Sequence, residues 1–263
     1  MKDVNLTRQD QVRQALEAAI AREQLYLCYQ AQTRLADHKM VGLEALCRLS
    51  DGQLGDIPAD EFIPLAENTG LIVPLEKLVL TQVKRDLPLL LAQHPGIRIS
   101  VNLSTRHITA PGFFPFIQAW LDSLSPLAVP QLDFEITETC FQLFNDNDIE
   151  GLQQLRRRGP RIAMDDFGSG QSSLSRLHTL PFDVIKLDKQ FAQQIEHPMV
   201  YAIVKAALAF AQEFGIELIA EGVETAEQCQ VLQALDCRLV QGFYFSRPQP
   251  LAHWLTASDA PHP

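Results

Sequence analysis

Eight short apolar segments, spaced along the whole chain, constrain the fold more than any other feature of the sequence. They lie at residues 25–30, 41–49, 97–103, 132–136, 161–166, 183–187, 216–221 and 239–245. Segments with helical spacing of apolar residues separate most of them, at 9–22, 58–67, 74–91, 113–124, 149–158, 200–214 and 226–235, with a further short helix after 172. A proline-rich tail follows the last strand. Strands that alternate with helices predict βαβ units and a mostly parallel sheet.

The number of strands favours a closed barrel over an open sheet. Eight strands in 263 residues match a (β/α)₈ barrel, for which about 250 residues is typical. No Gly-x-Gly-x-x-Gly or Walker motif supports an open nucleotide-binding sheet. The connection at residues 37–39 is too short for a crossover helix, so the first two strands can pair as a hairpin. Because we find no linker or change in composition, we expect one domain over residues 1–263.

Charge and cysteine content exclude several classes of protein. The formal net charge is −10, which disfavours DNA, RNA or an anionic membrane surface as a partner, although a small anionic substrate could bind near local cations. Five scattered cysteines without C-x-x-C spacing argue against a disulfide framework or a zinc ribbon and fit a reducing compartment. The N-terminus has no apolar signal core, and no stretch is long and apolar enough for a membrane span. We therefore expect a cytoplasmic protein.

Each of the last seven strands carries a polar residue within or at the end of its apolar run. These residues are Glu44, Asn102, Glu135, Asp165, Asp166, Lys186, Glu221 and Gln241. In a parallel barrel the carboxyl ends of the strands meet at one face, where active sites are built. Taken singly, each has a structural explanation: the Asp165-Asp166 pair could lie in a solvated turn, Glu44 could face solvent, and Lys186 could be a structural ion-pair partner. Their recurrence on successive strands favours a shared site.

The residue types indicate a particular chemistry. Carboxylate and amide oxygens suit Mg²⁺ or Mn²⁺, and none of the seven histidines lies at a strand end, which disfavours zinc. The acids are more numerous than one magnesium ion needs, which fits two ions bridged by an aspartate and a shared water that attacks phosphorus. Lys186 could hold that water or stabilise phosphate charge. The residues thus predict metal-dependent hydrolysis of a phosphoester without identifying which one.

At these positions the chain resembles the EAL-domain family, bacterial phosphodiesterases that cleave cyclic di-GMP to linear pGpG. The motifs that carry the resemblance are Glu44-Ala-Leu-Cys-Arg48, Phe62-Ile-Pro-Leu-Ala-Glu-Asn-Thr-Gly-Leu-Ile72, Ser100-Val-Asn-Leu-Ser104, Phe134-Glu-Ile-Thr-Glu138, Asp165-Asp-Phe-Gly-Ser-Gly170, Ile185-Lys-Leu-Asp188, Ala220-Glu-Gly-Val-Glu224 and Gln241-Gly-Phe-Tyr-Phe-Ser246. Three letters alone would be a weak match, but eight ordered motifs between residues 10 and 255 are specific.

The resemblance implies a modified barrel whose first strand runs antiparallel to the others, together with a set of roles for site residues. One ion, Mg²⁺ or Mn²⁺, would be bound by Glu44, Asn102, Glu135 and Asp165, and a second by Asp165, Asp166 and Glu221. Ca²⁺ would bind without supporting turnover. Lys186 would hold the catalytic water, and Glu221 has an alternative role as general base. Gln30, Leu46, Arg48 and Gln241 would contact the dinucleotide or support its site, and Glu138 and Glu224 would position the loop after Asp166.

The resemblance also implies a homodimer, formed by helices near residues 172–178 and 191–206. Two positions depart from the family pattern: Ala31 replaces a proline, which would loosen the substrate-side strand, and Gln171 replaces a tyrosine, which would alter the loop between site and dimer interface. No expected metal ligand is missing. Two alternatives stay open, a receptor that binds cyclic di-GMP without cleaving it and an enzyme acting on another phosphodiester. Any sensory or regulatory partner is unknown.

Overall fold

Eight strands close into a barrel that helices surround. The computed structural model describes residues 7–138, 143–169 and 182–256. The strands in these ranges are β1 (Tyr26–Arg34), β2 (Met40–Asp51), β3 (Gly55–Ile57), β4 (Arg98–Asn102), β5 (Leu132–Thr137), β6 (Arg161–Phe167), β7 (Val184–Leu187), β8 (Glu217–Ala220), β9 (Leu239–Gln241) and β10 (Gln249–Pro250). The barrel runs in the order β1, β9, β8, β7, β6, β5, β4 and β2, and the β1–β2 pairing closes it.

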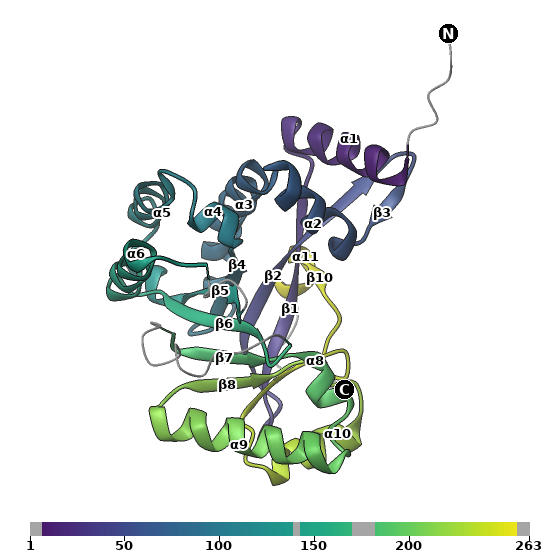
Figure 1. Cartoon of the computed structure of the whole chain (residues 1–263), viewed down its shortest axis with the longest axis vertical. Coiled ribbons are helices and arrows are strands. Elements are labelled where there is room, and N and C mark those ends of the chain that lie inside the picture. The colour runs from purple at the N-terminus through teal and green to yellow at the C-terminus, as the bar shows by residue number, and fades with distance from the viewer. Residues whose placement is uncertain (1–6, 139–142, 170–181, 257–263) are drawn as a thin grey trace.

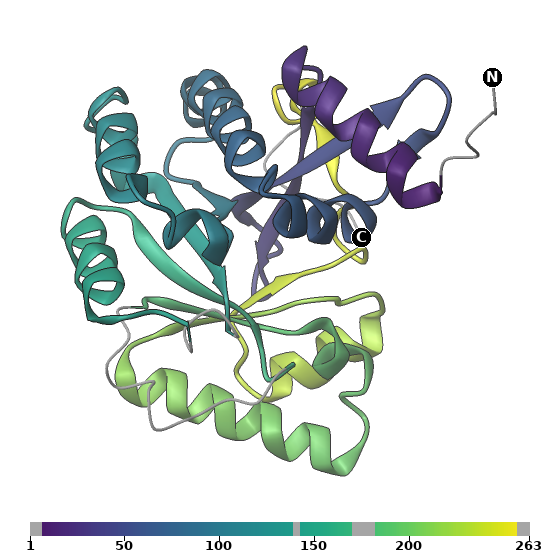
Figure 2. The same ribbon diagram turned by 45° about the horizontal axis from the view of Figure 1, so that its top comes forward.

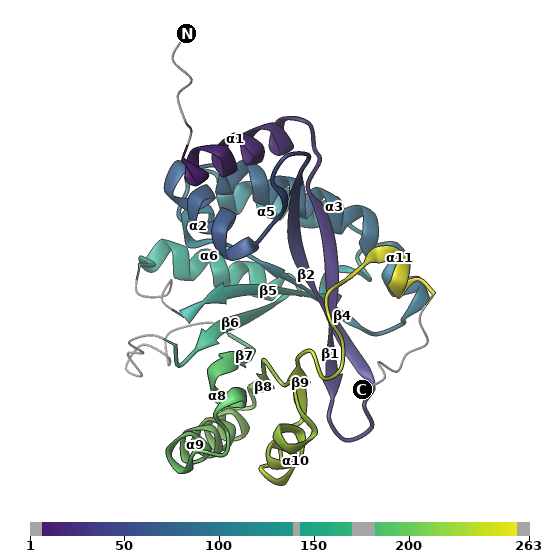
Figure 3. The ribbon, with the colours of Figure 1, turned by 90° about the vertical axis from the view of Figure 1, so that its right-hand side faces the viewer.

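Strand direction confirms the predicted modified barrel. β1 is antiparallel to both of its barrel neighbours, β2 and β9, whereas the other barrel pairs are parallel. The β1–β2 hairpin is the longest pairing and crosses the molecule in Figure 3. The short strands β3 and β10 extend this hairpin beyond the barrel. Two or three residues carry too little periodicity to be recognised in the sequence, which is why neither was expected.

The helices cover the outside of the barrel. They are α1 (Arg8–Ala21), α2 (Ala59–Thr69), α3 (Ile72–Gln93), α4 (Thr105–Ile108), α5 (Phe113–Asp122), η1 (Val129–Gln131), α6 (Asp146–Arg157), α8 (Lys189–Gln193), α9 (Pro198–Phe214), α10 (Ala226–Ala234) and α11 (Leu251–Trp254). In Figure 1, α9 and α10 lie beside β8, and α1 to α3 lie near the hairpin at the other end. Figure 2 shows the helices arranged around the strands.

Helix boundaries follow the capping residues. Thr7 and Asp10 form a capping box at the start of α1, and Asn145 and Asp148 form another at the start of α6. Gly215, with φ of 65°, ends α9. The expected helix after residue 172 falls outside the described residues. None of the described helices combines the length and the apolar character that crossing a bilayer would need.

Two details of the C-terminal part differ from expectation. The strand expected over 239–245 ends at Gln241, because the backbone at Gly242 lies against Val223, where an added Cβ would be 2.0 Å from the Val223 carbonyl oxygen. The segment expected to be a proline-rich tail packs against the barrel. The indole Nε1 of Trp254 donates to the Tyr29 carbonyl oxygen at 3.0 Å, and His94 Nε2 lies 2.7 Å from the Trp254 carbonyl oxygen.

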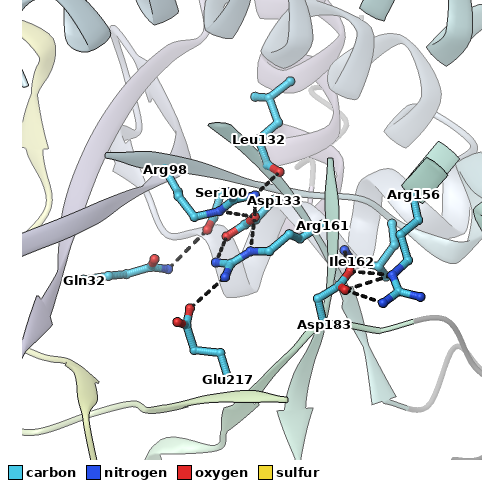
Figure 4. Close-up of polar contacts among 10 residues, drawn as sticks. All are labelled: Gln32, Arg98, Ser100, Leu132, Asp133, Arg156, Arg161, Ile162, Asp183 and Glu217. Carbon is cyan, nitrogen blue, oxygen red and sulfur yellow. Dashed lines mark hydrogen bonds and ion pairs between the residues drawn. The ribbon is translucent and has the colours of Figure 1, made fainter. Parts of the chain in front are cut away.

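Ion pairs tie the amino ends of the parallel strands together. Asp133 on β5 accepts hydrogen bonds from Arg98 on β4 (Nε, 2.7 Å) and from Arg161 on β6 (Nη2, 2.6 Å) (Figure 4). Arg161 also donates to Glu217 at the start of β8, 2.9 Å away. These charges largely satisfy one another, so this end of the barrel is a structural clamp. The predicted site residues lie at the opposite end.

Candidate active site

Lys186 on β7 lies at the centre of the predicted cluster. Its side chain is 1% exposed, and its Nζ is 2.6 Å from Glu135 Oε2, 2.8 Å from Glu221 Oε1 and 3.4 Å from both Glu44 Oε2 and Asp165 Oδ1. Four strands and the turn after β8 therefore bring one ammonium and four carboxylates together. Its ion pairs are made with the predicted site acids themselves.

Amide side chains bridge the acids on the β1–β2 side of the cluster. Glu44 is 6% exposed, so it does not face solvent. Its Oε1 accepts from Asn102 Nδ2 at 2.9 Å, and its Oε2 accepts from Gln241 Nε2 at 2.5 Å. Gln241 Nε2 also lies 3.3 Å from Gln30 Oε1. Residues of β1, β2, β4 and β9 are thus connected at this side of the site.

Asp165, Asp166 and Glu221 form a second grouping. One carboxylate oxygen from each lies within 4.8 Å of the others, a spacing that suits a shared cation. Asp166 has a φ of 54°, a left-handed conformation that is uncommon outside glycine, at the end of a strand where the β6–β7 register shifts. This backbone turn brings two consecutive acids to the same side of the barrel end.

The acids carry more negative charge than Lys186 can balance. Burial, together with the charges of Asp165 and Glu44, raises the pKa of Glu221 to about 8, against the lowering effect of Lys186. Burial and the Asp165 charge raise the pKa of Asp166 to about 6. Burial and the charge of Glu44 also raise the pKa of Glu135. Burial lowers the pKa of Lys186, but the charges of the four surrounding acids raise it by more. Further positive charge would therefore bind favourably here.

A divalent cation fits the donors that this site offers. Glu135 Oε1, Asp165 Oδ1 and Gln241 Oε1 are buried and accept no hydrogen bond from the residues that the structure describes, although Asp165 Oδ1 lies 3.4 Å from Lys186 Nζ. Buried oxygens without a donor are costly in a folded protein, and a hard cation would satisfy them. The donor set consists of oxygen atoms, which Mg²⁺ and Mn²⁺ prefer. Asp165 belongs to both groupings, so it is the residue placed to bridge two ions.

Three of the predicted substrate residues, Gln30, Leu46 and Arg48, lie on one face of the β1–β2 hairpin. Gln30 pairs with Glu44 and is buried in the cluster, where its Nε2 donates to the Ser246 carbonyl oxygen at 3.0 Å. Leu46 and Arg48 follow on β2 at two-residue spacing, and both are half-buried. Arg48 donates to its neighbour's carbonyl oxygen and makes no ion pair with any residue that the structure describes. This face leads outward from the acids and presents an unpaired cation.

The two residues expected to position the loop after Asp166 differ in their contacts. Glu138 is buried, and its Oε2 accepts a hydrogen bond from the Gly168 amide at 2.7 Å. Glu224 is exposed, and within the described ranges its carboxylate makes no hydrogen bond or ion pair. Gln171 and the expected dimer helix at 172–178 lie outside the described residues.

Sequence reasoning gave no role to two groups that contact the site. The hydroxyl of Ser246, the last residue of the Gln241–Ser246 motif, accepts from the Ala31 amide at 3.1 Å. A proline at position 31 could not make that bond. Glu76 on α3 accepts from the Ser104 amide at 2.6 Å, just beyond Asn102. The one signal in the sequence is that helical spacing puts Glu76 on the buried side of α3, where an apolar residue is usual.

Comparison with known proteins shows which family this chain is similar to. The model of the EAL domain family matches residues 13–248. An uncharacterized signaling protein of Caulobacter vibrioides is 40% identical over 93% of the chain and 30% of its own length. The cyclic di-GMP phosphodiesterase NbdA of Pseudomonas aeruginosa is 38% identical over 95% of the chain and 32% of its own length. The chain thus spans less than a third of either relative.

Solved structures show the same barrel. The PaMucR phosphodiesterase in complex with c-di-GMP superposes with a TM-score of 0.84 at 37% identity, over 91% of this chain and 98% of that one. The EAL enzyme Bd1971 with cAMP and cyclic di-GMP bound superposes with a TM-score of 0.87 at 28% identity, over 94% of this chain and 68% of that one.

Proposed function

The chain belongs to the EAL domain family, and on that premise we propose that it hydrolyses cyclic di-GMP to linear pGpG at the acidic cluster around Lys186. The single observation that carries the proposal is the excess of buried carboxylates over cations in the described part of the chain, where some of the buried oxygens accept no hydrogen bond. A structural ion-pair cluster would balance its charges, as the clamp at the other end of the barrel does.

We assign the metal ligands from the two groupings. Glu44, Asn102, Glu135 and Asp165 would hold one Mg²⁺ or Mn²⁺, and Asp165, Asp166 and Glu221 the other. The two ions would supply a water of lowered pKa and would neutralise charge on the reacting phosphate. The position of Glu221 in the Asp165–Asp166 grouping favours a ligand role over that of a separate general base.

The protein's own residues orient the reactants. Lys186 is held rigidly by four acids, and once cations neutralise some of these, its ammonium can donate to the attacking water or to a phosphate oxygen. Arg48, which makes no ion pair with the described residues, would donate to a phosphate of the dinucleotide. Gln30 and Gln241 fix the Glu44 side of the site by their mutual contact. Glu138 holds the Gly168 amide and so supports the turn that carries Asp166.

We further propose that the chain forms a homodimer through α9. Met199, Ile203 and Phe214 are exposed on one side of this helix, whereas Phe191 and Ala192, also in the expected interface, are buried. The exposed apolar face would be covered in a dimer. Ile203→Glu should shift the molecular mass measured by analytical ultracentrifugation from dimer to monomer. A wild-type protein that is monomeric at micromolar concentration would contradict the proposal.

Chromatography of cyclic di-GMP incubated with the protein tests the function. We expect conversion to pGpG with Mg²⁺ or Mn²⁺, and none with Ca²⁺ or with a chelator. Glu221→Gln should abolish turnover, while Glu217→Gln should retain it, because these glutamates flank the same strand at opposite ends of the barrel. Binding without conversion would instead identify a receptor, and conversion of other phosphodiesters alone would move the assignment to another substrate.

A further inference from the structure

Asn102 differs from the other proposed ligands of the same ion because its side chain is not packed inside the protein. It is exposed at the end of β4, whereas Glu44, Glu135 and Asp165 are buried. Its amide Nδ2 donates to Glu44 Oε1. Because packing does not fix this side chain, its orientation depends on where the backbone of the strand end is held.

Hydrogen bonds hold the two residues that follow Asn102. The Leu103 amide donates to the Glu135 carbonyl oxygen at 2.8 Å, which continues the β4–β5 pairing. The Ser104 amide leaves the sheet and donates to Glu76 Oε1 at 2.6 Å, and the Ser104 hydroxyl donates to Glu67 Oε1 at 2.7 Å. The Glu76 carboxylate on α3 therefore accepts the hydrogen bond of the first backbone amide beyond the sheet.

Glu76 itself is held on its other oxygen. Its Oε2 lies 2.7 Å from His107 Nδ1, and both side chains are buried, at 5% and 2% exposure. The rings of Phe113 and Phe116 pack around His107, at centroid distances of 4.9 and 5.7 Å. Burying a carboxylate is costly unless its hydrogen bonds are made, so an apolar residue would attach α3 to the barrel at lower cost. We therefore attribute to the Glu76 carboxylate a role other than packing, which is to hold Ser104 and His107 through its hydrogen bonds.

We propose that Glu76 is a positioning residue that fixes the strand end carrying Asn102 and thereby sets the affinity of the adjacent metal site. This inference rests on the proposed metal site but not on turnover. Residues that orient metal ligands commonly contribute 10- to 100-fold to affinity. Glu76 would belong to this class although it lies 26 residues before the ligand in the sequence, on a different element.

The test is calorimetric titration of Mn²⁺ into metal-free protein, with unfolding measured in parallel. We expect Glu76→Leu to raise the Kd for Mn²⁺ by about 10-fold or more, and Glu76→Gln, which keeps an acceptor for the Ser104 amide, to change it by less than about threefold. Asp86→Leu is the matched control. Asp86 also lies on α3 and accepts a hydrogen bond, from Tyr29 OH at 2.7 Å, so this variant removes a comparable contact far from Asn102 and should leave the Kd unchanged.

A second pair of variants tests the same bond from its donor side. Ser104 has a φ of −74°, which proline adopts without strain, so Ser104→Pro deletes the amide hydrogen that Glu76 accepts. Ser104→Ala deletes the hydroxyl and keeps that hydrogen. We expect Ser104→Pro to weaken Mn²⁺ binding as Glu76→Leu does, and Ser104→Ala to bind nearly as wild type. Wild-type affinity in Glu76→Leu or Ser104→Pro would overturn the inference, and absence of Mn²⁺ binding by the wild type would overturn both the inference and the metal site.

Discussion

Replacement of Lys186 by methionine would measure how strongly the acids at the site repel one another. The substitution keeps the buried stem and removes the ammonium that contacts four carboxylates, two of them within 2.8 Å. At an effective dielectric constant of about 20, a charge pair at about 3 Å interacts by roughly 5 kcal/mol, but desolvation offsets much of this. Removing one partner from a buried pair costs about 3–5 kcal/mol net. We expect a loss of that size in the unfolding free energy of the metal-free protein at pH 8.

The loss should depend on pH in a defined direction. The folded-state pKa of Glu221 is raised to about 8, above its unfolded value, so this acid favours folding most when protonated and its contribution falls as pH rises. Without Lys186 the acids repel one another more, and the stability difference from wild type should therefore be larger at pH 8 than at pH 6. Because cations that bind only the folded state stabilise it, saturating Mg²⁺ should recover part of the loss at pH 8.

Urea denaturation in a chelator, followed by circular dichroism at both pH values, would measure these free energies. Lys84→Met, an exposed lysine on α3, is the control and should unfold as wild type does. The reasoning fails if Lys186→Met at pH 8 lies within about 1 kcal/mol of wild type, a change typical of surface positions. It also fails if the penalty is larger at pH 6 than at pH 8.

Three further predictions concern the same end of the barrel. Glu44→Ala should abolish pGpG formation while leaving a folded protein, and Asp165→Asn should be at least as damaging because a bridging charge is lost; near-normal turnover in either, measured by chromatography with Mg²⁺ present, would contradict the ligand assignment. The affinity for Mg²⁺, measured calorimetrically, should rise from pH 6 to pH 8.5, because Glu221, with a pKa of about 8, must lose its proton to bind the cation; a pH-independent Kd would exclude it as a ligand. Gly242→Ala should cost about 3 kcal/mol or more in urea denaturation, since the new Cβ would lie 2.0 Å from the Val223 carbonyl oxygen; Gly52→Ala, with open space around it, is the matched control, and equal stability of the two variants would contradict this reading.

The barrel could be predicted from the sequence because its signals are local. Apolar runs of five to seven residues bounded by helical segments identify β4 to β8 almost to the residue, and the short connection at 37–39 indicated the hairpin whose first strand runs against the rest. The strand ends also indicated which polar residues would meet. That prediction needed only the rule that parallel strands present their carboxyl ends together.

What could not be predicted depends on contacts between distant residues. The role of Ser246 follows from β10 lying beside β1, and no local pattern reports that pairing. Glu76 is one charged residue among the apolar residues on the buried side of α3, and only the approach of α4 reveals its two hydrogen bonds. Likewise, the sequence after the last strand indicated only a proline-rich tail, whereas Trp254 forms hydrogen bonds with residues more than 150 positions earlier.

The pairing of β1 with β9 has a consequence for synthesis of the chain. Gln32 lies opposite Gln241, so the strand translated first cannot complete its hydrogen bonds until more than 200 further residues have been made. At about 5–20 residues per second, the nascent chain would wait roughly 10–40 s on the ribosome with one edge of its first hairpin unpaired. An open strand edge is a template for association with other chains. The interval before β9 emerges is therefore the period in which the unfinished barrel is most exposed to aggregation.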